Sequence, residues 1–147
     1  TIEGAVGFYD GESFNNSPAG QLLAQTDPNG AGIELDGTQI VAVAAFLRVL
    51  NALENIRQSV ELLETSDKKG LAERKEAREL LKQAVTETRD SIKDLDGGGL
   101  HPEAVAHLKN AKKLAEKAAR SFFSRHALTK EAIDEQRKAR AQLIEAS

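Results

Sequence analysis

Histidine is the first side chain to consider for chemistry, because imidazole ligates metals and transfers protons near neutral pH. The chain has three, at His101, His107 and His126. Metal ligands on a helix are usually three or four residues apart, so that they share a face. His101 and His107 are six apart and point to different faces. We therefore expect His101 to cap the start of a helix and His107 to pair with Glu103 on a helix surface. We expect His126 to lie near a helix C-terminus, where the helix dipole favours a cation.

Carboxylates and glycines give no catalytic pattern either. Glu73, Glu76 and Glu79 alternate with basic residues, which is typical of a solvated helix face, and no Glu-x-x-His motif of a di-metal bundle occurs. Gly97–Gly99 lacks the Lys-Ser/Thr and the preceding strand of a phosphate loop, so we interpret it as a helix connection. We predict no catalytic, cofactor-binding or metal-ligating residue in this chain.

Two aromatic features remain. The segment Arg120–Arg125 combines Phe122 and Phe123 with two cations and could form a binding patch. The interpretation that we prefer places Phe122 in a core and Phe123 at the edge of a helix pair. Tyr9 is the only tyrosine, and we expect it to be partly buried, with a packing role.

Composition limits the function classes. The 147 residues are 40% hydrophobic and 29% charged, and helix-forming residues dominate, which predicts an all-α protein. A net charge of −3 gives no electrostatic case for nucleic acid. No apolar run approaches the ~20 residues that span a bilayer, so we expect no membrane span. The absence of Cys excludes disulfides and thiolate chemistry within the chain.

The elements that would position these side chains begin with a short helix. We predict a helix over residues 1–10 with Thr1 as its N-cap, followed by a loop over residues 11–36. Within that loop we expect at most one helical turn after Pro18 and a tight turn at Asp27–Gly30.

A long helix and a bundle come next. Asp36 and Gln39 form a capping-box pattern, and the helix that follows extends to about residue 65. Further helices are expected over residues 71–95, from His101 to about residue 125, and from an N-cap at Thr129 to about residue 146. Residues that share one helical stripe predict the core of an antiparallel bundle. They are Leu53, Ile56, Val60, Leu63, Leu81, Val85, Thr88, Ile92, Leu95, Ala104, Leu108, Ala111, Ala115, Ala118, Phe122, Ile133, Leu143 and Ile144.

The start of the long helix is apolar on nearly every face, which is typical of a helix that is buried all round. Too little sequence precedes it to surround it. We therefore expect Val41, Ala45 and Phe46 to contact protein outside this chain, and we expect that Thr1 is not the natural N-terminus.

Four short motifs occur in a familiar order: Thr1–Tyr9, Phe14–Pro18, Ile33–Asp36 and Gln39–Arg57. In this order the chain resembles the C-terminal end of bacterial di-haem cytochrome c peroxidases. The family includes relatives that oxidise protein side chains, such as the methylamine-utilisation enzymes. The resemblance covers residues 1 to about 57, and those proteins end in a short helix, an irregular loop and a final helix on a haem domain.

The resemblance implies that residues 1–55 are the loop-rich C-terminal tail of a cytochrome c-like haem domain, and that residues 56–147 are a helical bundle extension. It implies a periplasmic oxidoreductase that passes electrons between c-type haems and reduces peroxide or oxidises a partner. The Cys-x-x-Cys-His attachment motif is absent, so haem c would be attached outside this chain. The chain itself would be non-catalytic, packing on a haem-bearing polypeptide or subunit and able to self-associate through the bundle. The alternative is a non-catalytic helical interaction or scaffold module without a redox role.

Overall fold

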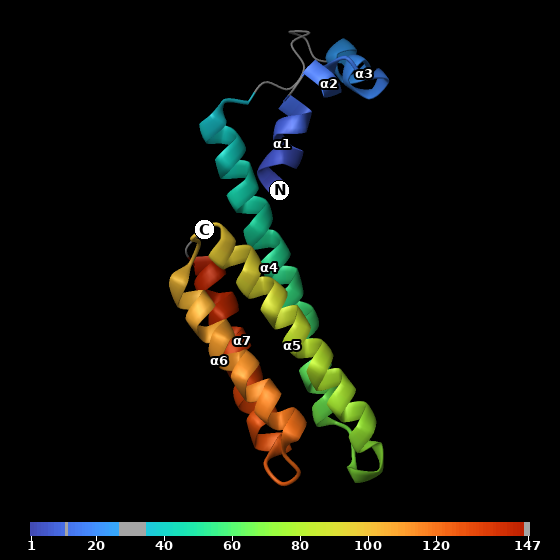
Figure 1. Ribbon diagram of the computed structural model, residues 1–147, viewed down its shortest axis with the longest axis vertical. Helices are drawn as coiled ribbons and strands as arrows, with labels where there is room; N and C mark the ends of the chain where they lie inside the picture. Colours follow the sequence, from blue (N-terminus) through green and yellow to red (C-terminus); the bar gives the residue numbers. More distant parts are fainter. Residues whose placement is uncertain (11, 27–34, 146–147) are drawn as a thin grey trace. The chain divides into compact units, whose positions relative to one another are not determined.

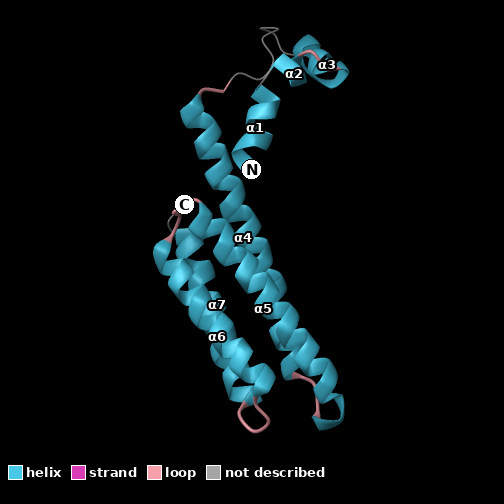
Figure 2. Cartoon of the chain, viewed as in Figure 1, coloured by secondary structure: helices cyan, strands magenta, loops and turns pink. Residues whose placement is uncertain are grey.

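The computed structural model describes residues 1–10, 12–26 and 35–145, and every regular element in these ranges is helical (Figure 2). This confirms the predicted all-α class. The chain divides into two compact units, Thr1–Arg48 and Val49–Ser147, and the division lies within one long helix. The helices, labelled in Figure 1, are α1 (Ile2–Asp10), α2 (Glu12–Asn15), α3 (Pro18–Thr26), α4 (Gly37–Asp67), η1 (Leu71–Glu73, a 3-10 turn), α5 (Arg74–Gly97), α6 (Pro102–Arg120) and α7 (Arg125–Glu145).

In the first unit, α1 begins as predicted. The backbone N–H of Gly4 donates to Thr1 Oγ1 over 3.0 Å, so Thr1 is the N-cap. An ion pair of 2.7 Å between Glu3 and Arg48 connects α1 to α4. The guanidinium of Arg48, which donates a hydrogen bond to the carboxylate, lowers the pKa of Glu3.

The segment predicted as loop contains two helices, α2 and α3, where we expected at most one turn. The predicted turn at Asp27–Gly30 lies outside the described residues. The loop prediction failed because it counted Gly, Asn, Ser and Pro as breakers, whereas here Ser17 and Pro18 begin a helix. The Ser17 hydroxyl caps α3 by accepting the Gly20 N–H over 3.1 Å.

Gly20 is where α3 passes closest to α2. A Cβ at this position would lie 2.1 Å from the carbonyl oxygen of Phe14, a distance that real contacts do not reach. Only glycine allows this approach, so Gly20 serves packing here and does not end the helix.

The predicted capping box at the start of α4 is confirmed. The Gln39 N–H donates to Asp36 Oδ1 over 2.8 Å, and the Asp36 N–H donates to Gln39 Oε1 over 2.9 Å. The two side chains thus satisfy each other's free backbone donors.

The second unit is the antiparallel bundle, formed by the later turns of α4 together with α5, α6 and α7 (Figure 1). Short connections join the helices. After α5 the chain turns at Gly99, whose φ of 63° lies in the left-handed region that glycine adopts without strain. The predicted stop at the glycine run is therefore confirmed.

The bundle core consists of two apolar clusters. One contains Ala52, Ile56, Leu95, Ala104, Val105, Leu108, Ala139 and Leu143. The other contains Leu63, Leu81, Ala84, Ala115, Ala118, Ala132 and Ile133. The stripes predicted for α4, α5 and α6 supply most of these residues, so the helical periodicity gave the correct inward faces.

Three predicted details of α6 and α7 are wrong. Helix α7 begins at Arg125, so Thr129 is not its cap but a buried residue whose hydroxyl donates to the Arg125 carbonyl over 2.8 Å. Phe122 follows the end of α6 and is 48% exposed, and Ile144 is equally exposed in the last turn of α7. Phe122 lies past the last residue of α6, whereas Ile144 follows the fully buried Leu143 and therefore lies on a different face of α7.

Candidate functional site

His101 stands at the N-cap position of α6, but no side-chain capping hydrogen bond forms there. Its φ of 47° places a non-glycine residue in the left-handed region. The prediction that the His101 side chain caps the helix is therefore wrong. Pro102 occupies the first turn of α6 and has no backbone N–H that would need an acceptor.

His107 pairs with a different acid from the one we predicted. Its Nδ1 lies 2.9 Å from Oε2 of Glu135 on α7, so the pair joins two helices instead of one face of α6. Lys138 donates to the same carboxylate over 2.7 Å. The hydrogen bond from Lys138, followed by that from His107, lowers the pKa of Glu135 to about 2.

His126 lies in the first turn of α7, not near a helix C-terminus as predicted. It forms an ion pair, when protonated, with Asp67 at the end of α4. Within residues 1–10, 12–26 and 35–145, no group of three His, Cys, Asp or Glu side chains is placed to hold a metal ion.

The acidic residues of α5 and of the turn before it form surface ion pairs, as the charge pattern predicted. Lys69 bridges Glu73 and Glu76 at 3.0 and 2.9 Å, and Lys82 pairs with Glu79 at 2.8 Å. Hydrogen bonds from these lysines lower the pKa values of Glu73 and Glu79.

Tyr9 belongs to a cluster of three aromatic rings in the first unit. Its ring centroid lies 4.9 Å from that of Phe14 and 5.7 Å from that of Phe8, and both pairs pack edge to face. Tyr9 and Phe8 are still 51% and 53% exposed. The cluster therefore holds α1 and α2 together, while about half of the surface of Phe8 and Tyr9 stays exposed.

The start of α4 leaves several large apolar side chains uncovered. Val41 and Phe46 are each 61% exposed, whereas Ala45 is half-buried and Ala44 is buried. By length and composition α4 is long and apolar enough to cross a membrane, and only 17% of its most apolar stretch is buried. A single helix of this kind is a weak indication, since core helices of water-soluble proteins share the same properties.

A polar layer, which the sequence analysis missed, separates the two apolar clusters of the bundle. Gln136 on α7 donates through Nε2 to Ser59 Oγ over 2.9 Å and to Thr88 Oγ1 over 2.6 Å. Both hydroxyls also donate to the carbonyl of Ala84, over 3.1 and 2.7 Å. All three side chains are fully buried. The only available signal was a polar residue at the inward spacing on each of α4, α5 and α7.

The Gln136 amide is incompletely satisfied. Its Oε1 is buried and accepts no hydrogen bond from any residue in the described part of the chain. An unpaired buried carbonyl oxygen costs about 1–3 kcal/mol, so the layer is a weak point of the bundle core.

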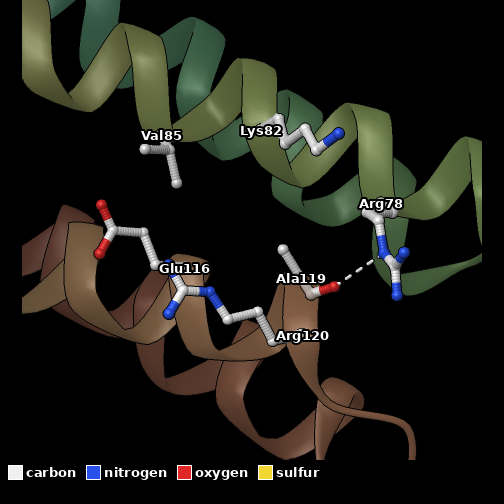
Figure 3. Close-up of a pocket in the computed structure, with 6 residues that line it drawn as sticks. All are labelled: Arg78, Lys82, Val85, Glu116, Ala119 and Arg120. Atoms are coloured by element: carbon white, nitrogen blue, oxygen red, sulfur yellow. Dashed lines mark hydrogen bonds between the residues drawn. The ribbon is translucent and has the colours of Figure 1, made fainter.

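A groove of about 490 Å³ runs between α5 and α6 on the bundle surface (Figure 3). We call it the arginine groove, and it is lined by Arg78, Lys82, Val85, Glu116, Ala119 and Arg120. Arg78 donates through Nε to the Ala119 carbonyl over 3.0 Å, which fixes its guanidinium across the groove. Next to it, Arg74 stacks over the Phe122 ring at 4.7 Å, and Phe123 is 93% exposed.

No protein family, curated protein or solved structure matches this chain.

Proposed function

We propose that this chain is the non-catalytic C-terminal portion of a periplasmic di-haem peroxidase-like oxidoreductase. Residues 1–55 pack on a haem-bearing polypeptide or subunit and shield it from water, and residues 56–147 add the bundle. The observation that carries this proposal is the uncovered apolar start of α4, with Val41 and Phe46 each 61% exposed. An exposed apolar surface of this extent marks an interaction site in a protein that folds in water.

The half-exposed aromatic cluster around Tyr9 supports the same proposal. Two separate segments of Thr1–Arg48 leave large apolar side chains uncovered, and both coincide with motifs that carry the resemblance. Covalent attachment of haem c requires two cysteines, and this chain has none. Its residues do not fit that cofactor, so we assign them no step of electron transfer.

The test uses the native assembly isolated through a tag on this chain. The proposal predicts a Soret absorption band in that assembly. Where the haem is on a separate subunit, Phe46→Asp should release that subunit, and the purified chain should lose the band. Leu71→Asp is the matched control, because Leu71 is 76% exposed in the second unit and its change adds the same charge. A colourless assembly would refute the haem connection.

The second candidate is a helical interaction module without a redox role. One observation favours it: the bundle encloses its own apolar core, in two clusters of fully or nearly fully buried residues. Such a unit needs no haem domain to fold. A colourless assembly that still loses its partner on Phe46→Asp would support this candidate over the first.

A further inference from the structure

The arginine groove has a surplus of positive charge. Of its four charged residues, Lys82 pairs with Glu79 and Glu116 pairs with Lys112. Arg78 and Arg120 form no ion pair with any carboxylate of the described residues. Two guanidinium groups therefore flank one groove on a protein whose net charge is −3.

The floor between these cations is apolar. Val85 on α5 and Ala119 on α6 are half-buried and pack against the second apolar cluster of the bundle, and both line the groove (Figure 3). The small side chain of Ala119 leaves the space open, and the volume of about 490 Å³ falls in the range of ~300–1,000 Å³ that is typical of ligand sites. A ligand that fits must bring an apolar group and negative charge together.

Arg78 is already oriented for such a ligand. Its Nε bond to the Ala119 carbonyl uses one of five guanidinium donors and leaves both terminal nitrogens free for a carboxylate. Because this contact exists before binding, less side-chain entropy is lost when an anion arrives. Paired N–H donors match a carboxylate in a bidentate geometry.

The positive surface continues past the groove. A second hollow is lined by Arg74, Lys75 and Glu79 together with Arg78 and Lys82, so the two hollows share two cations. The exposed Phe122–Phe123 pair stands beside Arg74, with ring centroids 4.8 Å apart. The recognition surface is thus longer than a small-molecule pocket and suits an extended chain.

We propose that the arginine groove binds an acidic segment of a partner protein, with an apolar side chain on Val85 and Ala119 and flanking carboxylates on Arg78 and Arg120. Charge complementarity selects this occupant. A flat layer of anionic lipid would reach Phe123 and the outer cations but not the floor between two helices. The inference concerns the bundle alone and stands independently of the haem proposal.

The test measures fluorescence anisotropy of a labelled short peptide in which glutamates flank a Leu-Phe pair, added to the full chain. We expect saturable binding that weakens as salt approaches ~0.15 M, and no binding of the same peptide with lysines in place of glutamates. Arg120→Glu should weaken binding about tenfold, whereas Arg140→Glu, at an exposed position on α7 and with the same charge change, should not. Arg120→Lys should weaken peptide binding less than Arg120→Glu, because lysine keeps the positive charge and loses only the paired N–H donors of the guanidinium.

Three outcomes would overturn the proposal. The first is absence of peptide binding by a folded chain. The second is an equal loss with Arg120→Glu and Arg140→Glu, which would mean unspecific charge attraction. The third is binding of phosphatidylserine vesicles that depends on Arg120 and that the acidic peptide does not displace, which would identify a membrane surface as the occupant.

Discussion

Replacement of Gln136 by methionine should stabilise the bundle, although it removes two hydrogen bonds. Methionine keeps the unbranched shape of glutamine and has no strong polar atom. The change deletes the Nε2 donations to Ser59 and Thr88, each worth about 1 kcal/mol net. It also deletes the unpaired Oε1, which costs about 1–3 kcal/mol, and buries an apolar side chain in place of an amide.

No hydroxyl donor loses its partner in this variant. Ser59 and Thr88 still donate to the Ala84 carbonyl, so only acceptor capacity stays unused. The sum of these terms is a gain of about 1 kcal/mol in the free energy of unfolding. Replacement of a buried polar group by an apolar one of similar volume is often neutral or stabilising in this way.

A double-mutant cycle with Thr88→Val separates the contributions. In the natural chain this change leaves one Gln136 N–H without an acceptor and should cost about 1–3 kcal/mol. In the Gln136→Met background the N–H is gone, so the cost should fall below about 0.5 kcal/mol, a coupling of about 1–2 kcal/mol.

The assay is urea unfolding followed by far-ultraviolet circular dichroism, with the denaturant slope as a check that the folded and unfolded states are unchanged. The reasoning fails if Gln136→Met lowers the free energy of unfolding by more than about 1 kcal/mol at an unchanged slope. It also fails if Thr88→Val costs the same in both backgrounds.

Three further predictions concern the core, a charge pair and a cap. Leu81→Ala should lower the free energy of unfolding by about 2–5 kcal/mol, while Leu71→Ala, at an exposed site, should change it by less than about 0.5 kcal/mol in the same urea experiment. Because the pKa of Glu135 is lowered to about 2, its stabilising contribution is complete above about pH 4.5 and is lost as the pH falls toward 2. Glu135→Gln should therefore destabilise by about 1 kcal/mol near neutral pH and not at all at about pH 2, and a constant difference across acid titrations would contradict this. Asp36→Ala should accelerate hydrogen exchange of the Gln39 amide about fivefold, since the cap is worth about 1 kcal/mol, and unchanged exchange would show that the cap is not populated.

Local sequence signals predicted the fold where a single helix supplies both partners of an interaction. Thr1 caps α1, and Asp36 and Gln39 cap each other, because these bonds span three residues. The inward stripe of α6 was readable for the same reason, since periodicity depends only on the helix itself. Such signals fix the faces and ends of helices but not their neighbours.

Pairings between helices were not predictable in this way. His107 could reach an acid on its own helix in the sequence, and only the packing of α6 on α7 offers Glu135 instead. The arginine groove likewise depends on the packing of α5 beside α6, which brings Val85 and Ala119 to one surface and which no spacing within either helix reveals. The prediction that Val41 and Phe46 contact protein outside this chain stays a prediction.

The buried polar layer also favours one alignment of the bundle helices along their length. If α7 slid by one turn, Ala132 or Arg140 would stand where Gln136 now meets the hydroxyls of Ser59 and Thr88. Rows of leucine and alanine alone tolerate such slippage, because one apolar contact resembles the next. A buried amide at one level makes the shifted arrangements differ in energy from the native one. The layer lowers the stability of the core and favours a single register of the helices.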